Sequence, residues 1–173
     1  MSTQKHWFVI RTFEADVFRF REEIEATGRE VWVPTRSWTR KVDGEAGQVQ
    51  IPLIPQILFV RCTEEGLRSY MQGHVGELGF YLAEDGQPLT VSDGDMDNFM
   101  RADAARETEN LNFMGLDAQR LALSDRVTVA GGRFSGIQGY FKKVGHDRAV
   151  LLDMPRVAVI KLHFIDLRYL KRV

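Results

Sequence analysis

Residues 51–62 of this 173-residue chain read Ile-Pro-Leu-Ile-Pro-Gln-Ile-Leu-Phe-Val-Arg-Cys, and they decide the fold of its first part. The run Ile57–Cys62 is short and apolar, which predicts a buried β-strand. Pro52 and Pro55 have no backbone N–H to donate, so residues 51–55 are not expected to form an ordinary central strand. The stretch therefore predicts an irregular segment that leads directly into a buried strand.

Two further strands and a helix are expected before this stretch. Residues 6–12 form an apolar run that is typical of a buried strand. Residues 17–27 have apolar side chains at spacings of three and four, which predicts a helix, and Gly28 follows where a left-handed cap belongs. Residues 30–33 alternate like a short strand. The polar residues 35–50 contain an Asp-Gly turn signal and predict a hairpin arm or a mobile loop.

The chain after Cys62 continues the same mixture of helices and strands. Thr63 and the two acids that follow it predict the start of a short helix that stops at Gly73. Residues 78–82 and 88–91 flank an Asp-Gly turn and predict an extended pair, and a third helix is expected from Ser92 to near Glu109. The predicted class is α+β.

The pattern changes beyond residue 110. Residues 110–122 show no sustained alternation and are expected to be a linker. Five short strands are then predicted about ten residues apart, and a small closed β-barrel is the architecture they favour. They cover residues 126–130, 140–144, 149–153, 157–162 and 167–170. We therefore divide the chain into domains at 1–109 and 123–173, joined by the linker.

The charge of the chain changes at the same place. The total is −1, but residues 1–110 contain 12 basic and 19 acidic side chains, whereas residues 120–173 contain 11 basic and 4 acidic ones. Charges interact only over about 8–10 Å at physiological salt, so this asymmetry matters more than the total. The near-neutral total excludes a uniformly basic, DNA-coating protein and nothing more.

Catalytic and metal-binding patterns are not found in the sequence. No two histidines have a metal-ligand spacing, no serine lies in a Gly-x-Ser-x-Gly context, and the single cysteine, Cys62, ends an apolar strand next to two acids. We expect Cys62 to be a buried structural residue. The sequence predicts a protein that is not an enzyme and has no cofactor or metal. No apolar run is long enough for a membrane helix, and no secretion signal is recognised, so we expect a cytoplasmic protein.

One loop of the second domain contains both glycines and an aromatic residue. Gly131–Gly136 contains several glycines but lacks the features of a phosphate-binding loop, so a tight connection between strands is the preferred interpretation. Phe134 lies at its tip. An exposed aromatic side chain there would be a binding anchor; alternatively, the ring folds back and caps the barrel.

The same loop resembles a known motif. Residues 125–144 are similar to a KOW motif, with a strand, a Gly-x-Phe-x-Gly turn, Gly139 and a second strand. The segments Trp7–Ile10, Val33–Thr35 and Pro52–Val60 resemble the NGN domain of NusG-type transcription factors, and Asp95–Met100 lies where the last helix of that domain begins. The sequences of residues 52–62 and 95–100 are most similar to those of the specialised RfaH and UpxY-type antiterminators.

The resemblance implies a transcription elongation or antitermination factor. Its NGN domain would be an antiparallel sheet flanked by helices, and its KOW domain a small SH3-like β-barrel. Its NGN domain would bind the coiled-coil tip of the largest RNA polymerase subunit through an apolar patch and reach the opposite lobe of the polymerase, which disfavours pausing or termination. The residues implied in the patch are Ile54, Ile57 and Phe59, supported by Trp7 and Phe8, and those implied at the opposite lobe are Arg68, Ser69 and Tyr70. Relatives often have an aromatic residue where this chain has Ile57.

Contacts with nucleic acid and with a second partner are also implied. The candidates for upstream or non-template DNA are Arg11, Phe18, Arg19 and Arg21, although neighbouring glutamates dilute this charge and a merely solvated face explains it equally well. The KOW barrel of relatives binds ribosomal protein S10 or the termination factor Rho, here through Arg133, Phe134 and Ile137. The basic barrel could instead bind RNA through Arg133, Lys142, Lys143 and Arg148.

Alternatives from the same and from other classes remain open. The chain could be a housekeeping NusG that acts with Rho, or a KOW-type RNA- or ribosome-binding module. RfaH-like proteins can also refold the second domain as a helical hairpin, but β-branched residues such as Val127, Val150 and Val159 favour the barrel. We expect a monomer.

Overall fold

A computed structural model describes residues 4–13, 16–42, 44–104, 111–114, 125–132, 134–144, 147–154, 158–162 and 170–173. The chain divides into two compact units, Met1–Asp93 and Gly94–Val173. Within the described residues, no helix is both long and apolar enough to cross a membrane.

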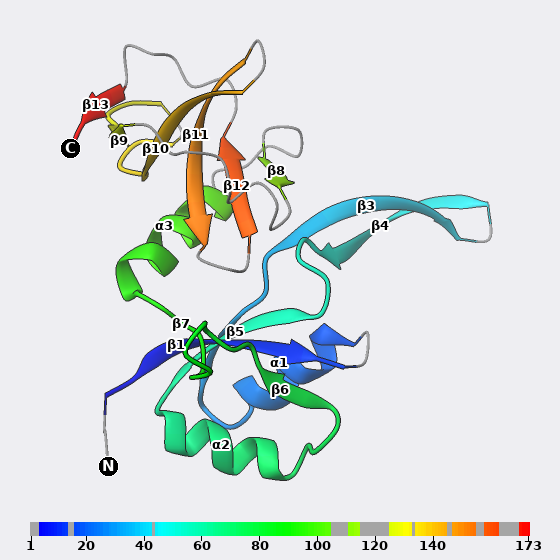
Figure 1. The fold of residues 1–173 in the computed structure, drawn as a ribbon. Helices are drawn as coiled ribbons and strands as arrows, with labels where there is room; N and C mark the ends of the chain where they lie inside the picture. Colours follow the sequence, from blue (N-terminus) through cyan, green and yellow to red (C-terminus); the bar gives the residue numbers. More distant parts are fainter. Residues whose placement is uncertain are drawn as a thin grey trace. The chain divides into compact units, whose positions relative to one another are not determined.

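The first unit is built on an antiparallel sheet (Figure 1). Its central strands are β1 (His6–Thr12) and β5 (Ile57–Cys62), flanked by β2 (Glu30–Trp32) and β6 (Leu78–Phe80), in the order β2-β5-β1-β6. The two-residue strand β7 (Thr90–Val91) also pairs with β1. The register places Val9 opposite Phe59. The strands predicted at 6–12, 30–33 and 57–62 and the extended pair near residues 78–91 are confirmed.

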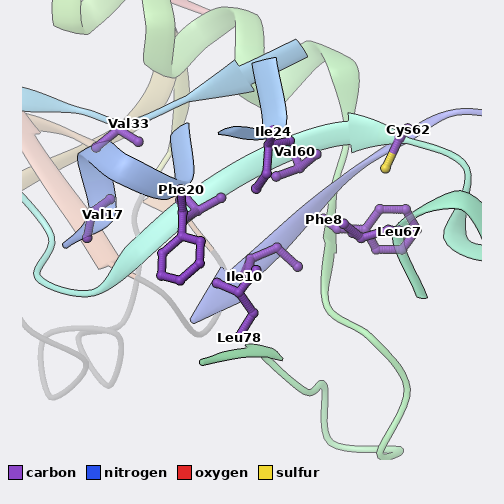
Figure 2. Packing of buried hydrophobic residues seen from close by; sticks show 11 residues of the cluster. Phe8, Ile10, Val17, Phe20, Ile24, Val33, Val60, Cys62, Leu67 and Leu78 are labelled. Carbon is purple, nitrogen blue, oxygen red and sulfur yellow. The ribbon is translucent and has the colours of Figure 1, made fainter. Parts of the chain in front are cut away.

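The two faces of this sheet have different surroundings. Phe8, Ile10, Leu58 and Val60 lie on one face and belong to the main apolar cluster, which also contains side chains of both helices of this unit (Figure 2). Directly opposite residues of antiparallel strands share a face, and successive residues alternate. Trp7, Val9, Ile57 and Phe59 therefore lie on the second face. Both faces of β5 are apolar, so its sequence is a continuous apolar run.

Both helices of the first unit begin with the side-chain caps that their sequences provide. α1 (Val17–Glu25) is capped by Asp16, whose carboxylate accepts a hydrogen bond from the Arg19 N–H at 3.0 Å. α2 (Glu64–Gln72) is capped by Thr63, whose hydroxyl accepts from the Gly66 N–H. The residues that α1 buries are Val17, Phe20 and Ile24. After α1 the chain turns through Gly28 at φ +79°, a conformation that favours glycine.

A two-stranded hairpin stands between β2 and β5. β3 (Thr35–Val42) and β4 (Glu45–Pro52) pair with each other over their whole length and form a separate sheet (Figure 1). Most of their described residues are exposed. Of the two predictions for residues 35–50, the hairpin arm is therefore confirmed. Pro52 lies at its end, where a missing N–H costs least.

The second unit contains most of α3 (Asp93–Ala104) and a sheet of short antiparallel strands. The sheet order is β13-β9-β10-β11-β12-β8. The strands are β8 (Leu111–Met114), β9 (Arg126–Val129), β10 (Gln138–Val144), β11 (Asp147–Met154), β12 (Ala158–Leu162) and β13 (Leu170–Arg172). The five strands predicted beyond residue 123 are present, with bounds shifted by up to a few residues.

Two features of this unit differ from the sequence-based division. Residues 111–114, which we expected to lie in the linker, form β8 and pair with β12. The four-residue strand is too short to show a period-two pattern, and its pairing partner lies more than 40 residues away. We assigned α3 to the first domain, whereas all of it from Gly94 onward belongs to the second unit.

Candidate functional site

The predicted apolar patch is divided between the two faces of the first sheet. Trp7, Ile57 and Phe59 share the second face, whereas Phe8 lies on the first and packs edge-on against Phe80 with 5.8 Å between ring centroids. The expectation that Trp7 and Phe8 support one patch is therefore wrong, because adjacent residues of a strand point to opposite faces. Phe59 is fully buried and Trp7 and Ile57 are 5% exposed, so all three form a supporting layer in this structure.

Two partly exposed apolar side chains are found near the ends of β2 and β5. Ile54, in the bend that precedes β5, is half-buried, and so is Trp32 at the end of β2. The indole ring of Trp32 lies 5.2 Å from the Phe59 ring between centroids. Sequence reasoning assigned no binding role to Trp32. Trp32 could have been recognised as a candidate, because a tryptophan in a three-residue edge strand has little room to be buried on both sides.

Arg61, a charged residue opposite Trp7, lies at one end of the second face. Its guanidinium donates hydrogen bonds to the Asp93 carboxylate at 3.0 and 3.1 Å and to Glu30 at 3.1 Å. The hydrogen bond from Arg61 holds the pKa of Asp93 below its usual value. The same two acids, through their hydrogen bonds, raise the pKa of Arg61. These contacts tie β5 to the edge strand β2 and to the residue at which α3 begins.

The three residues predicted on α2 do not form one surface. Arg68 and Ser69 are exposed, and Arg68 forms an ion pair with Glu64 one turn earlier at 2.7 Å. Tyr70 is half-buried and packs against the main apolar cluster. Burial, followed by the nearby Glu23 carboxylate, raises the pKa of the Tyr70 hydroxyl. Arg68 and Ser69 are therefore available for an external contact, whereas Tyr70 has a structural environment.

Arg19, one of the predicted DNA contacts, is engaged within the protein. Its guanidinium forms an ion pair with Glu77 at 3.0 Å, approaches Glu23 at 3.8 Å and lies 4.3 Å from the Phe20 ring centroid. Glu77 also contacts His74 Nδ1 at 2.9 Å. The hydrogen bond with His74, followed by that from Arg19, lowers the pKa of the Glu77 carboxyl. These acids neutralise the charge that a phosphate would meet.

The other three predicted DNA contacts lie in two places. Arg21 and Phe18 are neighbours on α1, with the guanidinium 5.3 Å from the ring centroid, and both are half-buried. Arg11 is exposed on β1, 5.8 Å from the exposed ring of Phe13. No residue of the β3–β4 hairpin was predicted to contact a ligand, although it contains the exposed pair Trp38 and Val49.

The loop of the second unit does not present its aromatic side chain. Phe134 is 3% exposed and Ile137 1%, so the prediction of an exposed anchor at the loop tip is wrong, and the alternative of a ring that folds back describes the structure. The cause is a compact turn in which the Gly136 N–H donates to the Val129 carbonyl and the Ile137 N–H to the Phe134 carbonyl. Arg133 lies outside the described residues, and contact of this loop with a partner stays a prediction.

Side chains of α3 hold the same loop. The Asn98 amide accepts from the Gln138 N–H at 3.0 Å and donates to the Gln138 carbonyl at 2.7 Å. Arg101 donates to the Ser135 carbonyl at 2.7 Å. These hydrogen bonds satisfy backbone groups at the start of β10. The side chains of Lys142, Lys143 and Arg148, the alternative RNA contacts, lie outside the described part.

No arrangement that suggests catalysis is seen in the described part of the chain. Among these residues, no cluster of three or more His, Cys, Asp or Glu side chains could hold a metal ion. Cys62 is buried, as predicted, and burial raises the pKa of its thiol, although Arg29 opposes this shift. A thiol of this kind is a poor nucleophile.

Comparison with known proteins identifies the first unit. A family profile described as transcription termination factor NusG matches residues 5–100, which is more than half of the chain. A structure of NusG from Thermotoga maritima, described as showing domain interaction, is similar over 98% of both chains, with 18% identity and a TM-score of 0.48. No curated protein matches the chain. On the extent of the family match, the chain belongs to the NusG family of transcription factors.

Proposed function

We propose that this NusG-family chain is a transcription elongation and antitermination factor of the RfaH or UpxY type. Residues 1–109, as an NGN domain, would bind RNA polymerase at the coiled coil of its largest subunit and suppress pausing or termination. Residues 123–173, as a small KOW barrel, would recruit a partner such as ribosomal protein S10. The protein would act as a cytoplasmic monomer and by binding, not by catalysis.

The observation on which the proposal rests is the family match together with the composition of the second sheet face. The apolar part of the second sheet face, formed by Trp7, Val9, Ile57 and Phe59, is suited to support an apolar interface. Trp32 adjoins this layer through the Phe59 ring, and Ile54 lies in the bend directly before β5. Both side chains are half-buried and can be reached from outside. An apolar helical partner needs such a surface, because its own apolar stripe must be buried. We therefore centre the proposed polymerase contact on Ile54 and Trp32.

The opposite-lobe contact is proposed at Arg68 and Ser69, which are exposed on α2. For DNA, Arg11 is the member of the predicted set whose exposure suits it best, since Arg19 is paired with Glu77. Phosphate attraction requires cations that no carboxylate already neutralises. Arg21 and Phe18 remain candidates for a weaker contribution.

Two alternatives make different predictions. A housekeeping NusG would bind polymerase in the same way but would recruit Rho and support termination. A KOW-type RNA- or ribosome-binding module would use the charge of residues 120–173 and would not bind polymerase. The family match includes none of residues 101–173, so it favours neither partner of the second domain.

The test is capture of core RNA polymerase by the full chain and by two glutamate variants. Ile54→Glu adds a charge at the proposed contact, and Leu82→Glu is the matched control, because Leu82 is also apolar and is 51% exposed. Ile54→Glu should abolish capture while Leu82→Glu preserves it, with both variants folded by circular dichroism. Capture that survives Ile54→Glu, or that is lost equally in both variants, would contradict the assigned interface.

Transcription in vitro across a terminator separates the functional alternatives. The antiterminator increases read-through whether or not Rho is present. A housekeeping factor increases termination only when Rho is added, and Rho is then captured by the full chain. An RNA-binding module changes neither reaction through polymerase and captures no core enzyme.

A further inference from the structure

The β3–β4 hairpin has two chemically different faces. Because directly opposite residues share a face, Arg36, Trp38 and Arg40 lie on one face together with their partners Ile51, Val49 and Gly47. The other face has hydroxyl and amide side chains together with Lys41, and Gln50 donates a hydrogen bond to the Ser37 hydroxyl across it at 2.8 Å. We name the first of these the Arg-Trp-Arg face.

The central aromatic side chain of this face is exposed. Trp38 is 52% exposed and its partner Val49 37%, although tryptophan is usually among the most buried residues of a small protein. A cross-strand pair of an aromatic and a β-branched residue stabilises a hairpin by only about 0.2–1 kcal/mol. That role accounts for the pairing of Trp38 with Val49. It does not account for two arginines on the same face.

The two arginines flank the ring and are not neutralised by the described carboxylates. Both are exposed, and the Arg36 guanidinium lies 5.4 Å from the Trp38 ring centroid. None of the ion pairs between described residues includes Arg36 or Arg40. Along a strand, side chains on one face repeat about every 7 Å, so the cations stand on either side of the ring at that spacing. Glu45 is the acidic residue on this face, and it lies at the turn end.

This combination matches the chemistry of an unpaired nucleic acid strand. Phosphates need cations that are free of carboxylate partners, and unpaired bases stack on exposed aromatic rings. A duplex would satisfy the arginines but would leave the indole without a partner, because its bases are already stacked. Gly47 lies opposite Arg40 and has no side chain, which leaves this part of the face open to a ligand.

The position of the polar side chains favours DNA over RNA. Proteins distinguish RNA through hydrogen bonds with its 2′-hydroxyl groups. The hydroxyl and amide side chains of the hairpin that could make such bonds are Thr35, Ser37, Thr39, Gln48 and Gln50, and all of them lie on the opposite face. We propose that the Arg-Trp-Arg face of the β3–β4 hairpin binds single-stranded DNA, with a base stacked on Trp38 and phosphates held by Arg36 and Arg40.

The test is direct binding of a fluorescein-labelled, single-stranded DNA oligonucleotide of about 12 nucleotides to the full chain, followed by anisotropy. Trp38→Val removes the ring and places a β-branched residue, which favours strands, opposite Val49, so the hairpin should persist. Arg40→Ala and Lys41→Ala form the matched pair, because they remove neighbouring cations from opposite faces of the same strand. Urea unfolding of each variant should match that of the original protein.

The expected results follow from stacking and from charge. Loss of one stacked base weakens binding roughly 5- to 150-fold, so Trp38→Val should raise Kd by about 5-fold or more. Arg40→Ala should reduce the magnitude of the negative slope of log association constant against log salt concentration by about 0.7, whereas Lys41→Ala should change Kd by less than about 2-fold. Binding should also quench tryptophan fluorescence in the original protein and not in Trp38→Val.

Several results would overturn the proposal. Equal losses in Arg40→Ala and Lys41→Ala, with no loss in Trp38→Val, would indicate diffuse charge attraction. Tighter binding of the matching duplex or of single-stranded RNA would assign the face to another ligand. If no oligonucleotide binds while the variants reduce polymerase capture, the face is a protein contact. None of these results alters the proposed polymerase interface, which is tested at Ile54.

Discussion

Replacement of Phe59 by alanine tests the layer beneath the proposed polymerase contact. Phe59 is fully buried on the central strand β5, and the Trp32 ring lies 5.2 Å from its own ring between centroids. Phenylalanine-to-alanine changes at such positions cost about 3–5 kcal/mol, because they lose burial and leave a cavity. Domains of this size are stable by about 5–15 kcal/mol, so the loss is a large fraction of the total.

Ile54→Ala is the partner experiment. Ile54 is half-buried in the bend before β5, so truncation should cost only about 1–2 kcal/mol, less than for a fully buried isoleucine. The free energy of unfolding would be measured for both variants by urea titration of the full chain, followed by circular dichroism. Polymerase capture would then be measured without urea. We expect Phe59→Ala to act mainly on stability and Ile54→Ala mainly on binding.

Two results would contradict the packing described for Phe59 and Ile54. A Phe59→Ala variant within about 1 kcal/mol of the original protein would show that the ring is not packed as described. An Ile54→Ala variant as unstable as Phe59→Ala would show that Ile54 belongs to the core and cannot report on binding. The same burial predicts that a charged residue at position 59 unfolds the first unit, so it cannot serve as a binding variant.

Three other features of the first unit can be tested by measuring stability or reactivity. The pKa of the Glu77 carboxyl is lowered from 4.5, mainly by the hydrogen bond with His74. The ionised carboxylate therefore stabilises the fold above that pH, and this stabilisation is lost as the pH falls through the lowered pKa of the folded state. In urea titrations from about pH 6 to 3, the free energy of unfolding should fall less in Glu77→Gln than in the original protein. The buried Cys62 thiol, whose pKa is raised by burial, should react with a disulfide reagent at pH 8 at least about tenfold more slowly in the folded protein than in urea. Gly28→Ala should cost about 1 kcal/mol because φ is +79° there, whereas Gly73→Ala, at φ −77°, should cost less than half as much in the same titration.

Local patterns predicted most elements because short-range chemistry decides them. The strand 57–62 and the helix that follows Thr63 begin and end as the sequence indicates, since an apolar run and a capping hydroxyl act over a few residues. The same rules could have separated Trp7 from Phe8, because alternation along a strand is a local property. The four-residue strand β8 could not be recognised, because its pairing with β12 spans most of the second unit.

The amino-acid pattern was sufficient to recognise an α+β unit followed by a strand-rich unit, their opposite charges, and the resemblance to NusG that the family match bears out. Tertiary structure alone decided which of the named side chains are available to a partner. Arg19 is neutralised by Glu77, 58 residues away, and Phe134 is buried by a turn that closes on Val129. The reason is physical: exposure and charge pairing depend on contacts between distant segments, which a linear pattern does not specify. For the same reason, the pairing of β3 with β4 decided that Trp38 faces Val49 between two arginines.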